Sequence, residues 1–233
     1  MAAATPTKNP KNVTIRGRVS FPVWTYKEAL ARNPQSKFPK KTDEEVTPEF
    51  NLLIEQAQLD KLKQHILTEF LPHATARFAA GEKKDSLDPD LAELIREKIE
   101  NEAWAAPGAN LMIKKISDKN KEAAPEAVAS IKIVGSRGVD IVLKATVKDE
   151  SELVIPDPDL LTFPAVLPIE KTVFQMYPGA YVATTLNLFA YFSSLQVHGI
   201  SAGASTAVYL GNLEGARFGG GTDLDEDEIF LDE

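Results

Sequence analysis

Two long stretches of the chain alternate between apolar and polar residues, and this alternation limits the chain to folds built on a β-sheet. In the first, residues 12–26, valine, isoleucine and phenylalanine share one face, while Arg16 and Arg18 share the other. In the second, residues 179–193, valine and leucine share one face, and most aromatic residues share the other. A period of two over this length is typical of a half-buried strand. We therefore expect two long strands, one near each end of the chain.

Helical signals occupy the interval between these strands. The Thr-Pro-Glu sequence at 47–49 predicts a helix start, because threonine caps a helix, proline suits its first turn and an acid suits the positive end of its dipole. Apolar residues then recur at helical spacing as far as Phe70, and Pro72 is expected to end or kink this helix. Asp-Pro-Asp at 88–90 repeats the start signal before a second apolar stripe. Both helices are expected to pack on a sheet.

The second half of the chain returns to strand patterns. A hairpin turn is predicted at Gly135–Gly138, and a last strand at about Ser205–Leu210. Because the strands do not alternate with helices, the order argues against a doubly wound parallel sheet. It indicates a mainly β or α+β fold, for which a five-stranded OB-type barrel is one of several solutions. We expect one domain over residues 1–220, with a helical insertion at about 47–104.

The residue content excludes several kinds of catalytic or metal site. There is no cysteine, so disulfides and thiolate metal ligands are excluded. Gly-Ile-Ser-Ala-Gly at 199–203 matches the nucleophile elbow of hydrolases, yet all three histidines precede Ser201, whereas the elbow order places one after it. We interpret this string as a glycine-rich turn between two antiparallel strands. His65 and Glu69 stand one helical turn apart without a second imidazole, so no metal site is predicted.

No targeting or membrane segment is evident either. No apolar run approaches the ~18 residues that span a bilayer. The first residues lack the apolar stretch of a secretory signal. Together with the absence of cysteine, this favours the cytoplasm. We predict a protein with no enzyme activity, no metal, no cofactor and no membrane contact.

The net charge of −8 is distributed unevenly. Lys8–Lys41 contains nine basic residues and one acidic residue, and Asn110–Lys148 contains eight basic and four acidic. Seven acidic residues fall in Asp223–Glu233 alone. The rest of the chain is therefore close to neutral, with two basic blocks. Such local asymmetry, rather than net charge, decides whether a groove can attract nucleic acid.

Aromatic and basic residues fall together on the polar faces of the predicted strands. Sequence-tolerant binding of a single strand needs cations for phosphates and aromatic faces for bases. Exposed aromatics favour aggregation unless they are covered, here either by the helical insertion or by a ligand. We expect arginines and lysines to contact phosphates and the tryptophan and tyrosines to stack on bases. The candidate DNA-binding residues are Arg16, Arg18, Trp24, Tyr26, Lys114, Lys115, Lys144, Tyr181, Phe189 and Tyr191.

The chain ends in an acidic segment, residues 221–233, which begins at the last of three consecutive glycines. Glycine and dense like charge predict a flexible, disordered tail. Acidic residues around a short apolar cluster suit a docking peptide. The same carboxylates are also able to imitate phosphates in the chain's own basic groove. The candidate docking residues are Asp225, Glu226, Asp227, Glu228, Ile229 and Phe230.

The sequence "MYPGAYVATTLNLFAYFSSLQVHGISAGASTAVYLGNLEGARFGGG" with the acidic tail resembles the single-stranded DNA-binding proteins of tailed phages, including the type described from Enterobacter phages. The similarity extends more weakly to "VTIRGRVSFPVW" and "LMIKKISDKNK". The resemblance implies an OB fold without enzyme activity. It implies a protein that coats single strands in phage DNA replication, recombination and repair, in the host cytoplasm.

The resemblance also implies roles for particular residues. Tyr191 matches the family's DNA-stacking tyrosine, and Lys114 matches a groove lysine, with Lys115 as the alternative. The tail implies replication proteins, such as a polymerase or a helicase-primase, as partners. The chain departs from the best-known members because Phe230 is followed by three more residues.

Two functions remain open at this point. The first is a sequence-tolerant single-stranded DNA-binding protein, with a homodimer as one allowed arrangement. The second is an acidic-tailed adaptor that binds only proteins, in which the aromatic row is buried under the helices or in an interface.

Overall fold

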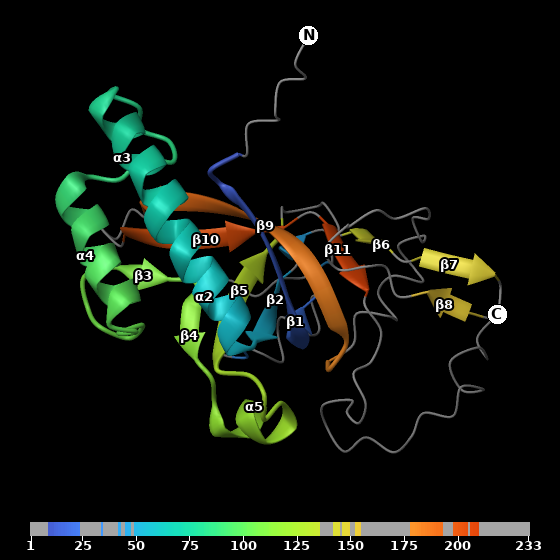
Figure 1. Ribbon diagram of the computed structural model, residues 1–233. Coiled ribbons are helices and arrows are strands. Elements are labelled where there is room, and N and C mark those ends of the chain that lie inside the picture. Colours follow the sequence, from blue (N-terminus) through green and yellow to red (C-terminus); the bar gives the residue numbers. More distant parts are fainter. Residues whose placement is uncertain are drawn as a thin grey trace, which may run out of the picture.

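The computed structural model of the chain describes residues 9–23, 34, 42, 45–47, 49–135, 142–144, 146–149, 152–154, 178–192, 198–204 and 206–209, and five of its strands close into a barrel (Figure 1). These strands are β1 (Asn12–Val23), β2 (Glu49–Ile54), β5 (Ala129–Val134), β9 (Tyr181–Phe192) and β10 (His198–Gly203). β1 pairs with β2 and β9, β2 with β5, and β9 with β10, all antiparallel. A parallel pair of β5 with β10 completes the ring. This arrangement is the five-stranded barrel of the OB fold.

The two alternating stretches form the two longest strands, and their predicted faces are confirmed. On β1, Val13, Ile15 and Val19 are buried in the core. On β9, the even-numbered residues from Val182 to Leu188 are buried, and Thr185 and Asn187 are exposed. Burial of one face of each strand fixes the register, because a one-residue slip would turn the apolar set outward.

The predicted start of the first helix, at residues 47–49, is wrong. Glu49–Ile54 forms the strand β2, and the helix begins only at Gln56. β2 lies between β1 and β5 in the barrel, and both of its faces are covered by other parts of the chain. Phe50 and Leu52 point to the core, and Leu53 packs against Ala124 and Ala127 outside it. A short apolar run that is buried on both faces has no period of two to distinguish it from a helix.

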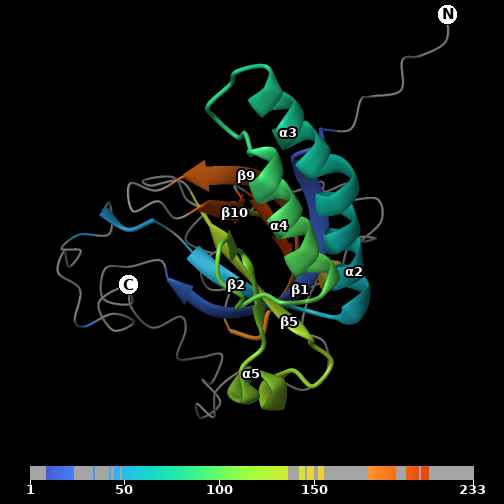
Figure 2. The same cartoon turned by 90° about the vertical axis from the view of Figure 1, so that its left-hand side faces the viewer.

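The helices within residues 56–100 lie together on one side of the barrel (Figures 1 and 2). α2 (Gln56–His65), the π-helical turn η2 (Ile66–Phe70) and α3 (Leu71–Ala79) follow one another directly. Their apolar stripe, including Leu59, Leu62 and Phe70, joins the barrel core. Among the described residues, no helix has the length and apolar character needed to cross a bilayer.

Pro72 does not end the helix, which continues to Ala79. It falls in the first turn of α3, just after η2. A proline ring clashes with the carbonyl of the residue four positions earlier, and a wider π-helical turn leaves room there. The predicted start of the second helix is confirmed: α4 (Pro89–Glu100) is capped by Asp88, whose side chain accepts a hydrogen bond from the Asp90 N–H at 2.9 Å.

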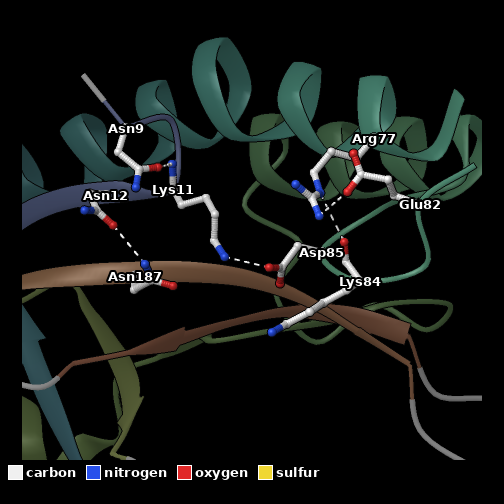
Figure 3. Close-up of polar contacts among 8 residues, drawn as sticks. All are labelled: Asn9, Lys11, Asn12, Arg77, Glu82, Lys84, Asp85 and Asn187. Carbon is white, nitrogen blue, oxygen red and sulfur yellow. Dashed lines mark hydrogen bonds and ion pairs between the residues drawn. The ribbon is translucent and has the colours of Figure 1, made fainter. Parts of the chain in front are cut away.

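Polar contacts fasten the loop between α3 and α4 to the start of β1 (Figure 3). The Lys11 ammonium lies 2.6 Å from the Asp85 carboxylate, which is almost buried. Asp85 has a φ of 54°, a conformation that aspartate tolerates better than most residues. Arg77 donates to the carbonyl of Lys84 at 3.1 Å. The helical segment is therefore tied to the barrel by charge as well as by its apolar face.

A short segment enters the barrel wall where β5 and β10 separate. β3 (Asn110–Leu111) pairs in parallel with β10, and β4 (Ile113–Lys115) pairs antiparallel with β5. Between them, the Met112 N–H donates to the carbonyl of Ile200 at 3.1 Å, and its carbonyl accepts from the Lys132 N–H at 3.0 Å. β5 and β10 pair directly over only a short length, so some of their backbone N–H and C=O groups would otherwise lack a hydrogen-bond partner. The inserted segment supplies partners for such groups on both strands.

The segment that follows α5 (Asp118–Ala123) covers Leu53 on the outer face of β2. The helix is capped by Ser117, whose hydroxyl accepts from the Asn120 N–H at 3.3 Å. The small residues Ala124 and Ala127 that follow it pack on Leu53, so the helix sits close to the sheet.

The remaining strands lie beside the ring. β11 (Thr206–Tyr209), which confirms the predicted last strand, pairs with β9 and with β6 (Val142–Lys144). β7 (Thr146–Asp149) and β8 (Glu152–Val154) form a separate antiparallel pair. Residues 136–138 of the predicted hairpin turn lie outside the described residues. In the described part, β6 pairs with β11 rather than with β5.

The close approach of β1 to β2 yields a stability prediction at Gly17. A Cβ added there would lie 2.2 Å from the carbonyl oxygen of Leu53, so the backbone itself must shift. We expect Gly17→Ala to lower the free energy of unfolding by about 1–3 kcal/mol, measured by urea denaturation.

Gly203→Ala is the matched control. Its added Cβ would come no closer than 3.4 Å to any neighbour, which is an ordinary contact. An equal effect of the two substitutions would contradict the packing described for Gly17.

Candidate nucleic-acid interface

A groove of about 1080 Å³ lies on the barrel wall around the inserted segment. Its walls are β3 and β4, the end of β9, the facing residues of β5 and β10, and the loop that follows α4. Four of the sequence-predicted residues line it together: Lys114, Lys115, Phe189 and Tyr191. These residues come from segments about 75 positions apart in the chain, so the fold brings them together.

Phe189 and Tyr191 form the aromatic side of the groove. Both lie on the outer face of β9 and are half-buried, opposite Ser201 and Gly199 of β10. A Cβ at position 199 would lie 2.1 Å from the carbonyl oxygen of Asn110 and 3.1 Å from the Tyr191 hydroxyl. Glycine at 199 therefore lets β3 and the tyrosine approach β10 closely.

The Gly-Ile-Ser-Ala-Gly string at 199–203 is thus a strand, and the predicted turn is wrong. All five residues belong to β10, which pairs with β9 along its whole length. Ser201 lines the groove from within this strand and not from the strand-to-helix turn that a nucleophile elbow requires. The two glycines at its ends read as a turn signal in the sequence, but close strand approach accounts for Gly199.

Lysines form the charged side of the groove. Lys114 and Lys115 are exposed on β4. Lys132 on β5 lines the groove as well, and its ammonium lies 2.7 Å from the Glu49 carboxylate. The predictions missed Lys132, although it occupies the polar position of an alternating strand. They also missed Trp104, which follows a helix in a loop without any periodic signal.

Arg16, Arg18 and Tyr181 lie elsewhere, at the other end of β9. Ten residues separate Tyr181 from Tyr191, roughly 33 Å along a strand. Arg18 pairs with Tyr181 across the β1–β9 ladder. Arg16 is partly exposed. Burial raises the pKa of Tyr181, and the nearby Glu55 raises it further, whereas Arg16 and Arg18 act in the opposite direction.

Arg18 is buried, with 8% of its surface exposed, and its Nε lies 2.5 Å from the Glu126 carboxylate. Its Nη1 has no hydrogen-bond partner in the described part of the structure. The sequence placed Arg18 on the polar face of β1 correctly. It gave no signal that the segment after α5, a hundred residues later, covers that face.

The other predicted residues are not placed by the structure. Lys144 lies in β6, but its side chain is outside the description. Trp24, Tyr26 and the whole tail lie outside the described residues, including the docking candidates Asp225, Glu226, Asp227, Glu228, Ile229 and Phe230.

His65 is buried, and its Nε2 lies 2.9 Å from the carbonyl oxygen of Pro10. Across the described ranges, no three residues among histidine, aspartate and glutamate gather in a way that could hold a metal ion.

Comparison with solved structures finds phage proteins. The single-stranded DNA-binding protein from bacteriophage Enc34 in complex with ssDNA matches with a TM-score of 0.47 and 14% identity, over 93% of this chain and 97% of that chain. A C-terminal truncation of the Enc34 protein matches with a TM-score of 0.45 and 14% identity, over 92% and 97%. The single-stranded DNA binding protein gp2.5 encoded by bacteriophage T7 matches with a TM-score of 0.41 and 10% identity, over 88% and 94%. No protein-family model and no curated protein matches the sequence. These three solved structures are of single-stranded DNA-binding proteins from bacteriophages.

Proposed function

We propose that this protein binds single-stranded DNA without sequence preference, in the groove around β3 and β4. The observation that carries the proposal is the meeting of half-buried Phe189 and Tyr191 with exposed Lys114 and Lys115 in one open groove. The aromatic faces suit unpaired bases, and the ammonium groups suit the phosphates between them. Bases stacked inside a duplex offer no free face, so the groove selects single strands.

The groove also bears on the adaptor alternative. That function requires the aromatic row to be buried either under the chain's own helices or in an interface, and the groove bears on the first of these arrangements. Phe189 and Tyr191 instead line an open groove, and the insertion supplies only the wall that follows α4. No observation in the described part of the chain favours the adaptor.

We assign supporting roles to the residues outside the groove. Arg16, with Tyr181 beside it, extends the contact along β1 and β9, and Arg18 orients this cluster through Glu126. Trp24, Tyr26 and Lys144 remain assigned to DNA as the sequence suggests. The proposed setting is the replication, recombination and repair of phage DNA in the host cytoplasm, without enzyme activity.

The acidic tail has two proposed roles. Ile229 and Phe230 dock on a replication protein, and the flanking carboxylates steer the encounter. While no partner is bound, the tethered carboxylates compete with DNA for the groove lysines.

Removing the aromatic side chain at 191 is expected to weaken binding. Tyr191→Ala loses one stacking contact, worth about 1–3 kcal/mol, which a fluorescence anisotropy titration with an unstructured oligonucleotide measures. Tyr191→Phe keeps the ring and should bind like the parent. Phe78→Ala removes an exposed aromatic on α3, outside the groove, and serves as the control. Equal affinities for Tyr191→Ala and Phe78→Ala would rule out stacking at this position.

Removing the groove lysines is expected to change the salt dependence. Each phosphate contact on a single strand contributes about 0.7 to the slope of log affinity against log salt. Lys114→Gln with Lys115→Gln should therefore flatten the slope by up to about 1.4. Lys61→Gln, an exposed lysine of α2 outside the groove, should leave it unchanged. A double variant that keeps the parent slope would show that these ammonium groups do not contact phosphates.

Deleting Asp223–Glu233 is expected to tighten binding, because seven tethered negative charges no longer compete with DNA. The gain should shrink as salt rises, since screening weakens the competitor. Titration of both forms at several salt concentrations measures it. Unchanged or weaker binding by the truncated chain would refute competition by the tail while leaving partner docking intact.

A further inference from the structure

The loop between α4 and β3 forms one wall of the groove. Five consecutive residues, Glu102–Ala106, line the groove, although the loop carries no strand or helix pattern. Trp104 is its one aromatic residue. The indole is half-buried and packs against the barrel core, so its ring is held on one side. A tryptophan that packs on the core and also lines an open groove is placed to offer a flat surface to a ligand.

A buried lysine of the preceding helix holds this loop through hydrogen bonds to its main chain. Lys98 lies on α4, with 3% of its surface exposed. Its ammonium donates to the carbonyl of Ala106 at 2.5 Å and also to the carbonyl of Ala109. Burial lowers the pKa of Lys98. Burying an ammonium group is costly, and hydrogen bonds to two loop carbonyls offset that cost only if the loop stays in place.

Further contacts hold the loop on either side of Trp104. The Ala103 N–H donates to the carbonyl of Lys98 at 2.9 Å, and the Ala106 N–H donates to that of Ala103 at 3.0 Å. The Lys63 ammonium of α2 lies 2.8 Å from the Glu102 carboxylate. Trp104 therefore sits in a loop bound on both sides, which limits the conformational entropy that a ligand would have to remove.

We propose that Trp104 is a third base-stacking side chain of the groove, and that Lys98 is the positioning residue that fixes it there. The inference rests on the proposed binding of single-stranded DNA and adds a residue of the helical insertion to the interface. Because Lys98 is buried, it acts through the loop and not on phosphate. The insertion then has a second task besides covering the barrel, since its last segment supplies a wall and an aromatic face.

The first test uses the emission of Trp104. The chain contains two tryptophans, so Trp24→Phe leaves Trp104 as the sole one. Because Trp24 is itself assigned to DNA, the affinity of Trp24→Phe is first measured against that of the native chain, and Trp24→Phe then serves as the parent for the emission measurements. Titration with oligothymidylate is expected to quench this emission as the groove fills. In the same background, Trp104→Ala should weaken binding by about fivefold or more, and Trp104→Phe by less, because the smaller ring still stacks.

The second test separates positioning from charge. Lys98→Met keeps the buried stem and removes the bonds to the two carbonyls. We expect weaker binding at every salt concentration with an unchanged salt slope, and smaller quenching of Trp104 at saturation. Lys114→Gln, the control, should instead flatten the slope. Urea denaturation of each variant checks that the barrel is folded under the titration conditions.

Each outcome decides something. The inference is overturned, and the proposed function stands, if two results are found together. The parent binds oligothymidylate without a change in the emission of Trp104, and both Trp104→Phe and Trp104→Ala bind as tightly as the parent. If folded Lys98→Met binds and quenches like the parent, Lys98 has no positioning role. If the native chain does not bind oligothymidylate at all, both the inference and the proposed function fail.

Discussion

The groove depends on the main chain at Met112. Its N–H bonds to β10 and its carbonyl to β5, so a single residue joins two barrel strands that have separated. The strand that follows it, β4, carries the exposed Lys114 and Lys115, which line the groove together with Phe189 and Tyr191. If β5 and β10 paired directly along their whole length, the wall would be continuous and the groove would be absent. Opening the barrel at one seam thus creates both the shape and the chemistry of the interface.

The sequence correctly predicted the strands that have the apolar core on one face and a different environment on the other. β1 and β9 face the core on one side only, so a period of two is visible in their residues. β2 is covered on both faces, by the core and by the segment after α5, so its residues show no period of two. The helix-start signal at 47–49 and the spacing of the apolar residues therefore led to the wrong prediction of a helix there. The closure of the barrel was also out of reach of local patterns, because it depends on the pairing of β10 with β5, some seventy residues earlier.

The candidate site shows the same division between local and distant information. Phe189 and Tyr191 were found because alternation on β9 places them on the outer face. Trp104 was missed because the loop that presents it is shaped by Lys98 and by contacts to α2, not by its own residues. Arg18 was placed on the right face, yet Glu126 from a distant segment covers it. The period of two in a strand therefore predicts which way a side chain points. It predicts that the side chain is exposed only where no later segment of the chain packs over that face.

Charge counts along the sequence also overstate how many cations a ligand can use. In the described part of the chain, Lys11 and Arg18 of the first basic block and Lys132 of the second each lie within an ion pair, so these three cations already meet a carboxylate inside the fold. A phosphate that reaches Lys132 must displace the Glu49 carboxylate. Among the described residues, no carboxylate forms an ion pair with Lys114, so a phosphate that reaches Lys114 displaces none of them. Counterion release supplies the sequence-independent part of nucleic-acid affinity. Of the groove lysines, we therefore expect those of β4 to contribute most to the affinity for single-stranded DNA.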